Sequence, residues 1–309
     1  MTSTRRKLFV AAQWIFAAAI VWAAVVALRG QWSAAAGRLA ALSIDWLWIA
    51  LATVIVLLTY GLLIDTWRRL VAGWGGYLTF GTAARIWFVS NLGKYLPGKV
   101  WSIAAMSVMA REQAVSPVAA AGSSILIQLI TISTGIGLAL FMGVRAIDQP
   151  SLAIVVGLVL AAAIASLPFT LPRLASVTSG LTGRTIEVPP LATGTLLLTV
   201  ARSLLSWLAY GVAFQFFVRG ILGSAAGATT SYIAVYAASY ILGFLALFAP
   251  GGVIIRESAL VAGMVRLGLA GQADAFAVAV ASRLWLTVVE LLPGFIYLAL
   301  TPRSSSKVS

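Results

Sequence analysis

The feature that most constrains this chain is a series of apolar segments, each about as long as a bilayer is thick. A helix of ~20 apolar residues spans the hydrocarbon core of a membrane, and a helix satisfies its own backbone hydrogen bonds where there is no water. The whole chain is 61% apolar and only 9% charged, whereas an ordinary soluble domain has about 25% charged residues. We therefore predict an all-α polytopic membrane protein. The predicted full spans cover residues 8–28, 44–64, 116–142, 151–171, 191–218, 230–248 and 273–300.

One apolar region is interrupted at residues 91–101, which read Asn-Leu-Gly-Lys-Tyr-Leu-Pro-Gly-Lys-Val-Trp. Pro97 has no backbone N–H to donate, and Gly93 and Gly98 weaken the helix on either side of it. We predict two short helices, 84–96 and 99–109, that meet at this break and re-enter from the same side. A broken helix is tolerated at membrane depth only where it is buried in protein or lines a wet cavity.

A second interruption, Pro250-Gly251-Gly252, precedes a short helix that we expect to end near residue 267. This half-helix carries Arg256 and Glu257. Its first N–H groups and the positive end of its dipole suit a phosphate group. Two interrupted, charged segments in one membrane protein are a strong sequence indication of a substrate site.

Three motifs resemble those of the bacterial family that includes the transmembrane translocase half of lysylphosphatidylglycerol synthases. They are residues 91–101 followed by Arg111, the run 250–257, and Ser282-Arg283 followed by Glu290. The likeness covers most of the chain and keeps the order of the motifs. One position departs from the family pattern, because Ile254 stands where the family usually has glycine. The resemblance implies a stand-alone, flippase-like membrane domain that moves a lipid between leaflets.

The predicted organisation is a single transmembrane domain over residues 1–309, with halves at 1–172 and 190–301 and no soluble catalytic domain. We predict seven full spans plus two re-entrant elements, with eight spans as the alternative. Two spans precede a broken segment in each half, a weak sign of an internal inverted repeat. If both broken segments enter from the cytoplasm, Lys and Arg are in excess on the side of the N-terminus, which places that end inside.

Charged residues within the apolar segments are the candidate site residues, since a central Arg or Lys costs ~2.5–3.5 kcal/mol to insert. Only Glu257 and Glu290 are placed to compensate these cations, so an anionic ligand is expected to balance the rest. Internal pairing is one alternative, for Arg283 with Glu290 through Thr287 on the same helix face. It is also an alternative for Arg256 with Glu257, although these adjacent residues are expected to point apart. Snorkelling to the interface is the alternative for the lysines. The candidate substrate-binding residues are Asn91, Lys94, Tyr95, Lys99, Arg202, Arg256, Glu257, Arg283 and Glu290.

Small and polar residues also share one face of the span 116–142, at Ser124, Gln128, Thr131 and Gly135. Such residues at helical spacing usually mark helix packing. Contact with a substrate is the other interpretation.

Composition excludes several classes of function. The chain has no cysteine and no histidine, which removes thiolate chemistry and the commonest general base and neutral metal ligand. It contains no phosphate-binding loop for a nucleotide, and we predict no cofactor and no metal. The net charge of +13 is explained by basic cytoplasmic loops facing anionic lipid rather than by nucleic acid.

The predicted function is that of a translocase in the bacterial inner membrane, more a transporter than an enzyme. Its ligand would be the headgroup of an anionic phospholipid or a polyprenyl phosphate, held in a central cationic cavity, with Glu257 and Glu290 as candidate proton carriers. One alternative is a membrane-embedded transferase acting on a lipid-phosphate donor, which would need acidic residues for metal or base chemistry. The other is a non-catalytic partner of an envelope-lipid enzyme.

Overall fold

The computed structural model describes residues 44–95, 101–146, 191–246 and 254–300, with a few single positions between 151 and 162. These residues form eight α-helices and one short 3-10 helix, and they contain no strand. The all-α prediction is confirmed for this part of the chain. The predicted spans 8–28 and 151–171, the break at Pro97-Gly98 and the Pro250-Gly251-Gly252 turn lie outside the described residues, apart from the single positions noted above.

Four helices in the described part are long and apolar enough to cross a membrane. They match four of the predicted spans, and their outer faces expose large apolar side chains such as Leu58 (69% exposed) and Leu284 (64%). Exposed apolar surface of this extent is typical of a lipid-facing bundle, so the chain is a membrane protein. The four are α2 (Trp46–Gly73), α5 (Pro117–Ala146), α7 (Thr193–Leu222) and α10 (Gln272–Leu300).

The shorter helices fall into two pairs. The first pair is α3 (Phe80–Asn91), extended by the 3-10 helix η1 (Leu92–Tyr95), and α4 (Trp101–Arg111). It confirms two short helices on either side of the first break. The helix α3 begins earlier than predicted because the Thr79 hydroxyl caps it, accepting the Thr82 N–H at 3.3 Å. The second pair is α8 (Thr229–Leu245) and α9 (Ile255–Arg266).

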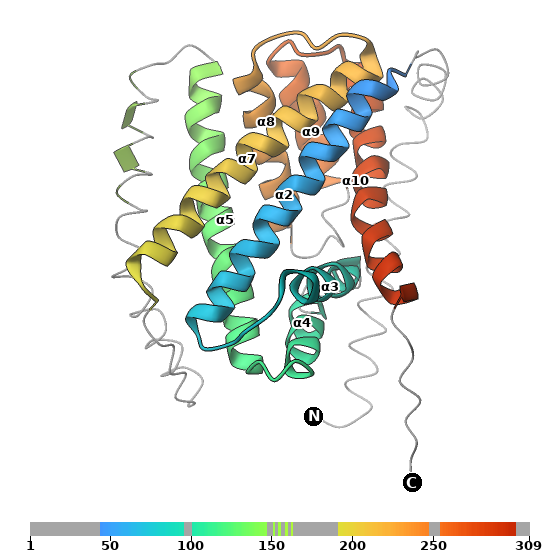
Figure 1. The fold of residues 1–309 in the computed structure, drawn as a ribbon. Coiled ribbons are helices and arrows are strands. Elements are labelled where there is room, and N and C mark those ends of the chain that lie inside the picture. Colours follow the sequence, from blue (N-terminus) through green and yellow to red (C-terminus); the bar gives the residue numbers. More distant parts are fainter. Residues whose placement is uncertain are drawn as a thin grey trace, which may run out of the picture.

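The two pairs lie at opposite ends of the bundle (Figure 1). The helices α3 and α4 lie at the end where α2 ends and α5 begins, while α8 and α9 lie toward the end where α7 ends and α10 begins. The expectation that both broken segments enter from one side is therefore wrong. The prediction of a sixth full span is also corrected, because the 17 residues of α8 extend only ~25 Å, less than the ~30 Å core.

The helices α2 and α7 cross in close contact near the start of α2 (Figure 1). The Asp45 N–H donates to the Gly220 carbonyl at 2.9 Å. A Cβ atom on Gly220 would lie 2.7 Å from Cδ1 of Ile49 and 3.1 Å from the Asp45 carbonyl oxygen. Glycine is therefore what lets the two backbones approach. The largest fully buried side chains include Trp67, Phe214, Phe217 and Tyr232, which place the core where α2, α7 and α8 pack together.

A glycine also allows close packing between the two arms of the first short pair, η1 and α4. A Cβ atom on Gly93 would lie 3.0 Å from the backbone nitrogen of Ser102 and 3.1 Å from the carbonyl carbon of Trp101. The end of η1 thus lies directly against the first turn of α4. Gly93 was predicted to loosen the helix, and in the structure it also removes the side chain that would separate the two arms.

Candidate functional site

A central cavity of about 290 Å³ lies between the helices, and each of the eight described α-helices contributes to its lining. Since a water molecule takes ~30 Å³ in the liquid, this volume is enough for several waters or for a polar headgroup. Of the predicted site residues, the cavity brings together four: Asn91, Arg256, Arg283 and Glu290. They come from α3, α9 and α10, which lie far apart in the sequence.

Arg256 and Arg283 share one carboxylate. Glu257 Oε1 lies 3.4 Å from Nη1 of Arg256 and 3.7 Å from Nη1 of Arg283. Both distances exceed the 2.7–2.9 Å of a strong charge-assisted hydrogen bond. Adjacent residues on a helix were expected to diverge, but the two side chains fold toward each other here. Glu257 is not among the cavity-lining residues, so it acts on the cavity through the arginines.

Arg256 is the most buried charged residue in the described part, with 4% of its surface exposed. Its guanidinium carbon lies 5.8 Å from the centre of the Tyr236 ring, a distance that allows a cation–π contact. Its Nη2 atom is buried and has no hydrogen-bond partner among the described residues. A buried donor without an acceptor costs ~1–3 kcal/mol, and more when it is charged. A hydrogen-bond acceptor at this atom would therefore be favourable.

Glu290 also lines the cavity and accepts a hydrogen bond of 2.8 Å from the Tyr60 hydroxyl. This bond ties α10 to α2. Arg283 thus contacts Glu257 of α9, and Glu290 contacts Tyr60 of α2. The pairing of Arg283 with Glu290 that the sequence suggested stays a prediction.

Aromatic side chains form much of the remaining wall. The ring of Tyr210 stacks on Tyr236 with centroids 5.7 Å apart, and Tyr240 packs edge-on against Trp207 at 5.5 Å. This aromatic wall was not predicted from the sequence. The signal was present in the spacing, because Tyr232, Tyr236 and Tyr240 recur every fourth residue on α8 and so share one face.

The polar face of α5 serves both packing and the cavity. Ser124, Gln128 and Thr131 line the cavity. Ser124 Oγ also accepts from the Trp67 indole N–H at 3.1 Å, and a Cβ atom on Gly135 would lie 2.6 Å from the Trp207 ring. This face therefore takes part in helix packing, and it is also placed where it could contact a substrate in the cavity.

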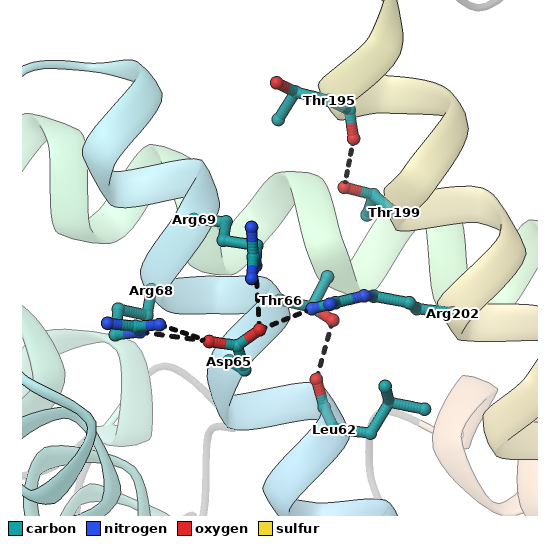
Figure 2. A network of polar contacts seen from close by, with 8 residues as sticks. All are labelled: Leu62, Asp65, Thr66, Arg68, Arg69, Thr195, Thr199 and Arg202. Carbon is teal, nitrogen blue, oxygen red and sulfur yellow. Dashed lines mark hydrogen bonds and ion pairs between the residues drawn. The ribbon is translucent and has the colours of Figure 1, made fainter.

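Arg202 lies outside the cavity. Its Nη1 donates to Oδ2 of Asp65 at 2.6 Å, and Arg68 and Arg69 donate to the same carboxylate (Figure 2). The expectation that only Glu257 and Glu290 compensate the membrane cations is wrong. The error follows from the end of α2, which we placed at residue 64. The helix continues to Gly73, so Asp65 lies within it and faces α7.

The cavity charges balance in number within the described residues, with Arg256 and Arg283 against Glu257 and Glu290. Among the described residues, the predicted surplus of positive charge is therefore not found at the central cavity. The N–H of Ile254, expected to face a phosphate, donates instead to Glu257 Oε2 at 2.8 Å. The side chains of Lys94, Tyr95 and Lys99 lie outside the described residues, as do Pro97, Gly98, Pro250, Gly251 and Gly252.

The fold and the cavity define a helical membrane protein with a charged, aromatic-walled chamber between its helices. Neither the family models nor the curated proteins include a match to this sequence.

Proposed function

We propose that this chain is a lipid translocase, which binds the headgroup of an anionic phospholipid or a polyprenyl phosphate in the central cavity. The resemblance of its three motifs to the transmembrane translocase half of lysylphosphatidylglycerol synthases supports this proposal. Two of those motifs contribute side chains to one cavity through Arg256 and Arg283, and the remaining one contributes Asn91.

The observation that carries the proposal is Arg256, whose side chain lines the cavity and whose buried Nη2 atom has no hydrogen-bond partner among the described residues. A phosphate oxygen would supply that acceptor, and a guanidinium binds phosphate oxygens in a planar, bidentate geometry. The contact between Glu257 and Arg256 is 3.4 Å long, so Arg256 can turn toward a ligand without first breaking a tight ion pair with Glu257.

The order of the helices supports an inverted repeat around this cavity. One long helix, two short helices and a second long helix follow one another in α2 to α5, and the same order recurs in α7 to α10. The two short pairs lie at opposite ends of the bundle (Figure 1). Transporters built from inverted repeats bind their substrates near the midplane, between interrupted helices. We assign the cavity to that interface.

The same order gives a topology for the bacterial inner membrane. The end of α5 and the start of α7 lie at opposite ends of the bundle (Figure 1), so a crossing at 151–171 would connect them. With a first crossing at 8–28 and a cytoplasmic N-terminus, the chain would have six full crossings and two re-entrant pairs. The α3–α4 pair would then enter from the cytoplasm and the α8–α9 pair from the other side, which moves Arg266 away from the cytoplasmic face.

Reconstitution into liposomes tests this function. The purified protein is expected to accelerate the movement of a labelled phosphatidylglycerol from one leaflet to the other, measured by accessibility to a membrane-impermeant quencher. Mass spectrometry should show that the lipid is chemically unchanged, since a change in mass would favour the transferase. Equal rates in protein-containing and protein-free liposomes, with either labelled phosphatidylglycerol or a labelled polyprenyl phosphate, would contradict the proposal.

A further inference from the structure

A second charged cluster lies between α2 and α7, separate from the central cavity. The Asp65 carboxylate accepts hydrogen bonds from three guanidinium groups: two from Arg68 to Oδ1, at 2.6 and 3.1 Å, one from Arg69 to Oδ2 at 2.7 Å, and one from Arg202 to Oδ2 at 2.6 Å (Figure 2). Three positive charges and one negative charge leave the cluster with an excess of about two positive charges. The central cavity, by contrast, is balanced among the described residues.

Asp65 cannot satisfy these arginines. A carboxylate accepts about four hydrogen bonds, and it receives that number here, whereas each guanidinium has five N–H donors. The structure shows no second acceptor for Arg69 or Arg202 within the described residues. Most of their donors therefore remain available to a ligand.

A notch of about 270 Å³ lies beside these two arginines. It is lined by Arg69 and Arg202 together with Thr66 and Thr199, and it does not include Arg68. The two threonine hydroxyls donate to backbone carbonyls of their own helices, at 2.7 Å each (Figure 2). The donors that a ligand would meet in the notch are thus the guanidinium N–H groups and the hydroxyl of Thr195, which also lines it. Such a set of donors recognises an anion.

The position of the notch indicates which anion. At 1.5 Å per residue, Asp65 lies roughly 28 Å along α2 from Trp46, close to the ~30 Å thickness of the hydrocarbon core. If α2 enters the hydrocarbon core near Trp46, the cluster lies toward the opposite interface, where lipid phosphates are found. The notch also reaches the outer surface of the bundle, because the Arg69 side chain is 51% exposed and Leu198, which lines the notch, is 41% exposed. Basic pockets between transmembrane helices are known to bind lipid headgroups.

We propose that the notch between α2 and α7 binds the phosphate of an anionic phospholipid from the surrounding leaflet. This site shares no lining residue with the central cavity. It holds a lipid at the rim of the bundle, with the acyl chains along the exposed apolar faces of α2 and α7. Arg69 and Arg202 bind the phosphate, and Asp65 fixes the orientation of both guanidinium groups.

The absence of cysteine from the chain allows a local test. A single Leu198→Cys substitution places a thiol in the notch, and its rate of alkylation by a neutral maleimide reports whether the notch is filled. In detergent, short-chain phosphatidylglycerol is expected to slow this reaction about tenfold. A Leu205→Cys variant, on the same helix and exposed outside the notch, should react at an unchanged rate.

Three comparisons separate the lipid site from its alternatives. Adding Arg69→Gln should weaken the protection by phosphatidylglycerol about tenfold, since it removes a charge-assisted donor. Adding Arg68→Gln also removes one arginine charge beside Asp65, but Arg68 does not line the notch. This substitution should change the protection less than twofold. Inorganic phosphate and short-chain phosphatidylcholine should protect poorly. Equal protection by either compound, or an equal loss in the Arg68→Gln variant, would overturn the proposal.

Discussion

The Tyr60 hydroxyl donates a hydrogen bond of 2.8 Å to Oε1 of Glu290, and this bond joins α2 to α10 at the wall of the central cavity. A hydrogen bond to a charged group contributes about 1.5–3 kcal/mol to stability. Tyr60→Phe should therefore lower the free energy of unfolding by about 2 kcal/mol, seen as a lower Tm in detergent. Tyr77→Phe is the matched control, because Tyr77 is 79% exposed, and its Tm should be unchanged. Equal Tm values for the two variants would show that this bond contributes nothing.

Ile254 has a backbone conformation that a β-branched residue rarely adopts. Its φ of 75° and ψ of −54° resemble those of a strained γ-turn, and strain of this kind costs ~1–3 kcal/mol. Ile254→Gly relieves it, against an entropic cost of ~0.5–1 kcal/mol for glycine in the unfolded chain. The substitution also removes a partly buried side chain, which offsets much of the gain. We therefore expect a net change within about 1 kcal/mol of zero, measured by thermal unfolding.

Ile255→Gly is the control for this prediction, since Ile255 is the first residue of α9 and has an ordinary helical backbone. That substitution should lower the Tm. The account of strain at the start of α9 fails if Ile254→Gly destabilises the protein as much as Ile255→Gly does.

Gly93 and Gly81 offer a second matched pair. An added Cβ at Gly93 meets backbone atoms of Trp101 and Ser102 at 3.0–3.1 Å, whereas one at Gly81 meets nothing within 4 Å. Gly93→Ala should separate η1 from α4 and destabilise the protein by about 1–2 kcal/mol, a typical cost of overpacking. Gly81→Ala should stabilise α3 by about 0.5–1 kcal/mol through helix propensity. Shifts in Tm of the same sign would contradict the close approach described here.

Asp65→Asn should destabilise the crossing of α2 and α7. The substitution leaves three arginines close together without their shared carboxylate, and partial exposure limits the cost to about 1–2 kcal/mol. Added salt should reduce the loss because it screens the repulsion. The control is Asp45→Asn, since the Asp45 side chain caps α2 by accepting the Leu47 N–H and asparagine caps a helix equally well. A loss of Tm that does not depend on salt would show that the charge of Asp65 is not its main role.

The sequence predicted the helical class, four of the long helices and the short pair around the first break, because apolar length and Pro-Gly interruptions are local signals. It could not predict at which end each pair lies. That depends on whether α8 crosses the membrane, and the apolar run 230–248 is long enough to suggest a full span, although the helix itself stops at Leu245.

The site was predicted only in part, because single charges are visible in the sequence but their tertiary contacts are not. Arg256, Arg283 and Glu290 stand out as charges in apolar segments, and they do meet in one cavity. Their pairing depends on tertiary contacts, and no sequence spacing indicates that Arg202 reaches Asp65 on another helix. The aromatic wall was missed because tyrosines on an apolar helix resemble ordinary core residues.

Headgroup binding in the cavity is tested most sharply by comparing two arginines on the same helix. Arg256 is buried and lines the cavity, whereas Arg266 is exposed in the last turn of α9 and does not line the cavity. In the liposome assay, Arg256→Gln is expected to slow the translocation of labelled phosphatidylglycerol at least tenfold without a change in fold, as judged by circular dichroism. Arg266→Gln should stay within twofold of the unsubstituted protein. Equal translocation rates for the two variants would contradict a headgroup-binding role for the cavity.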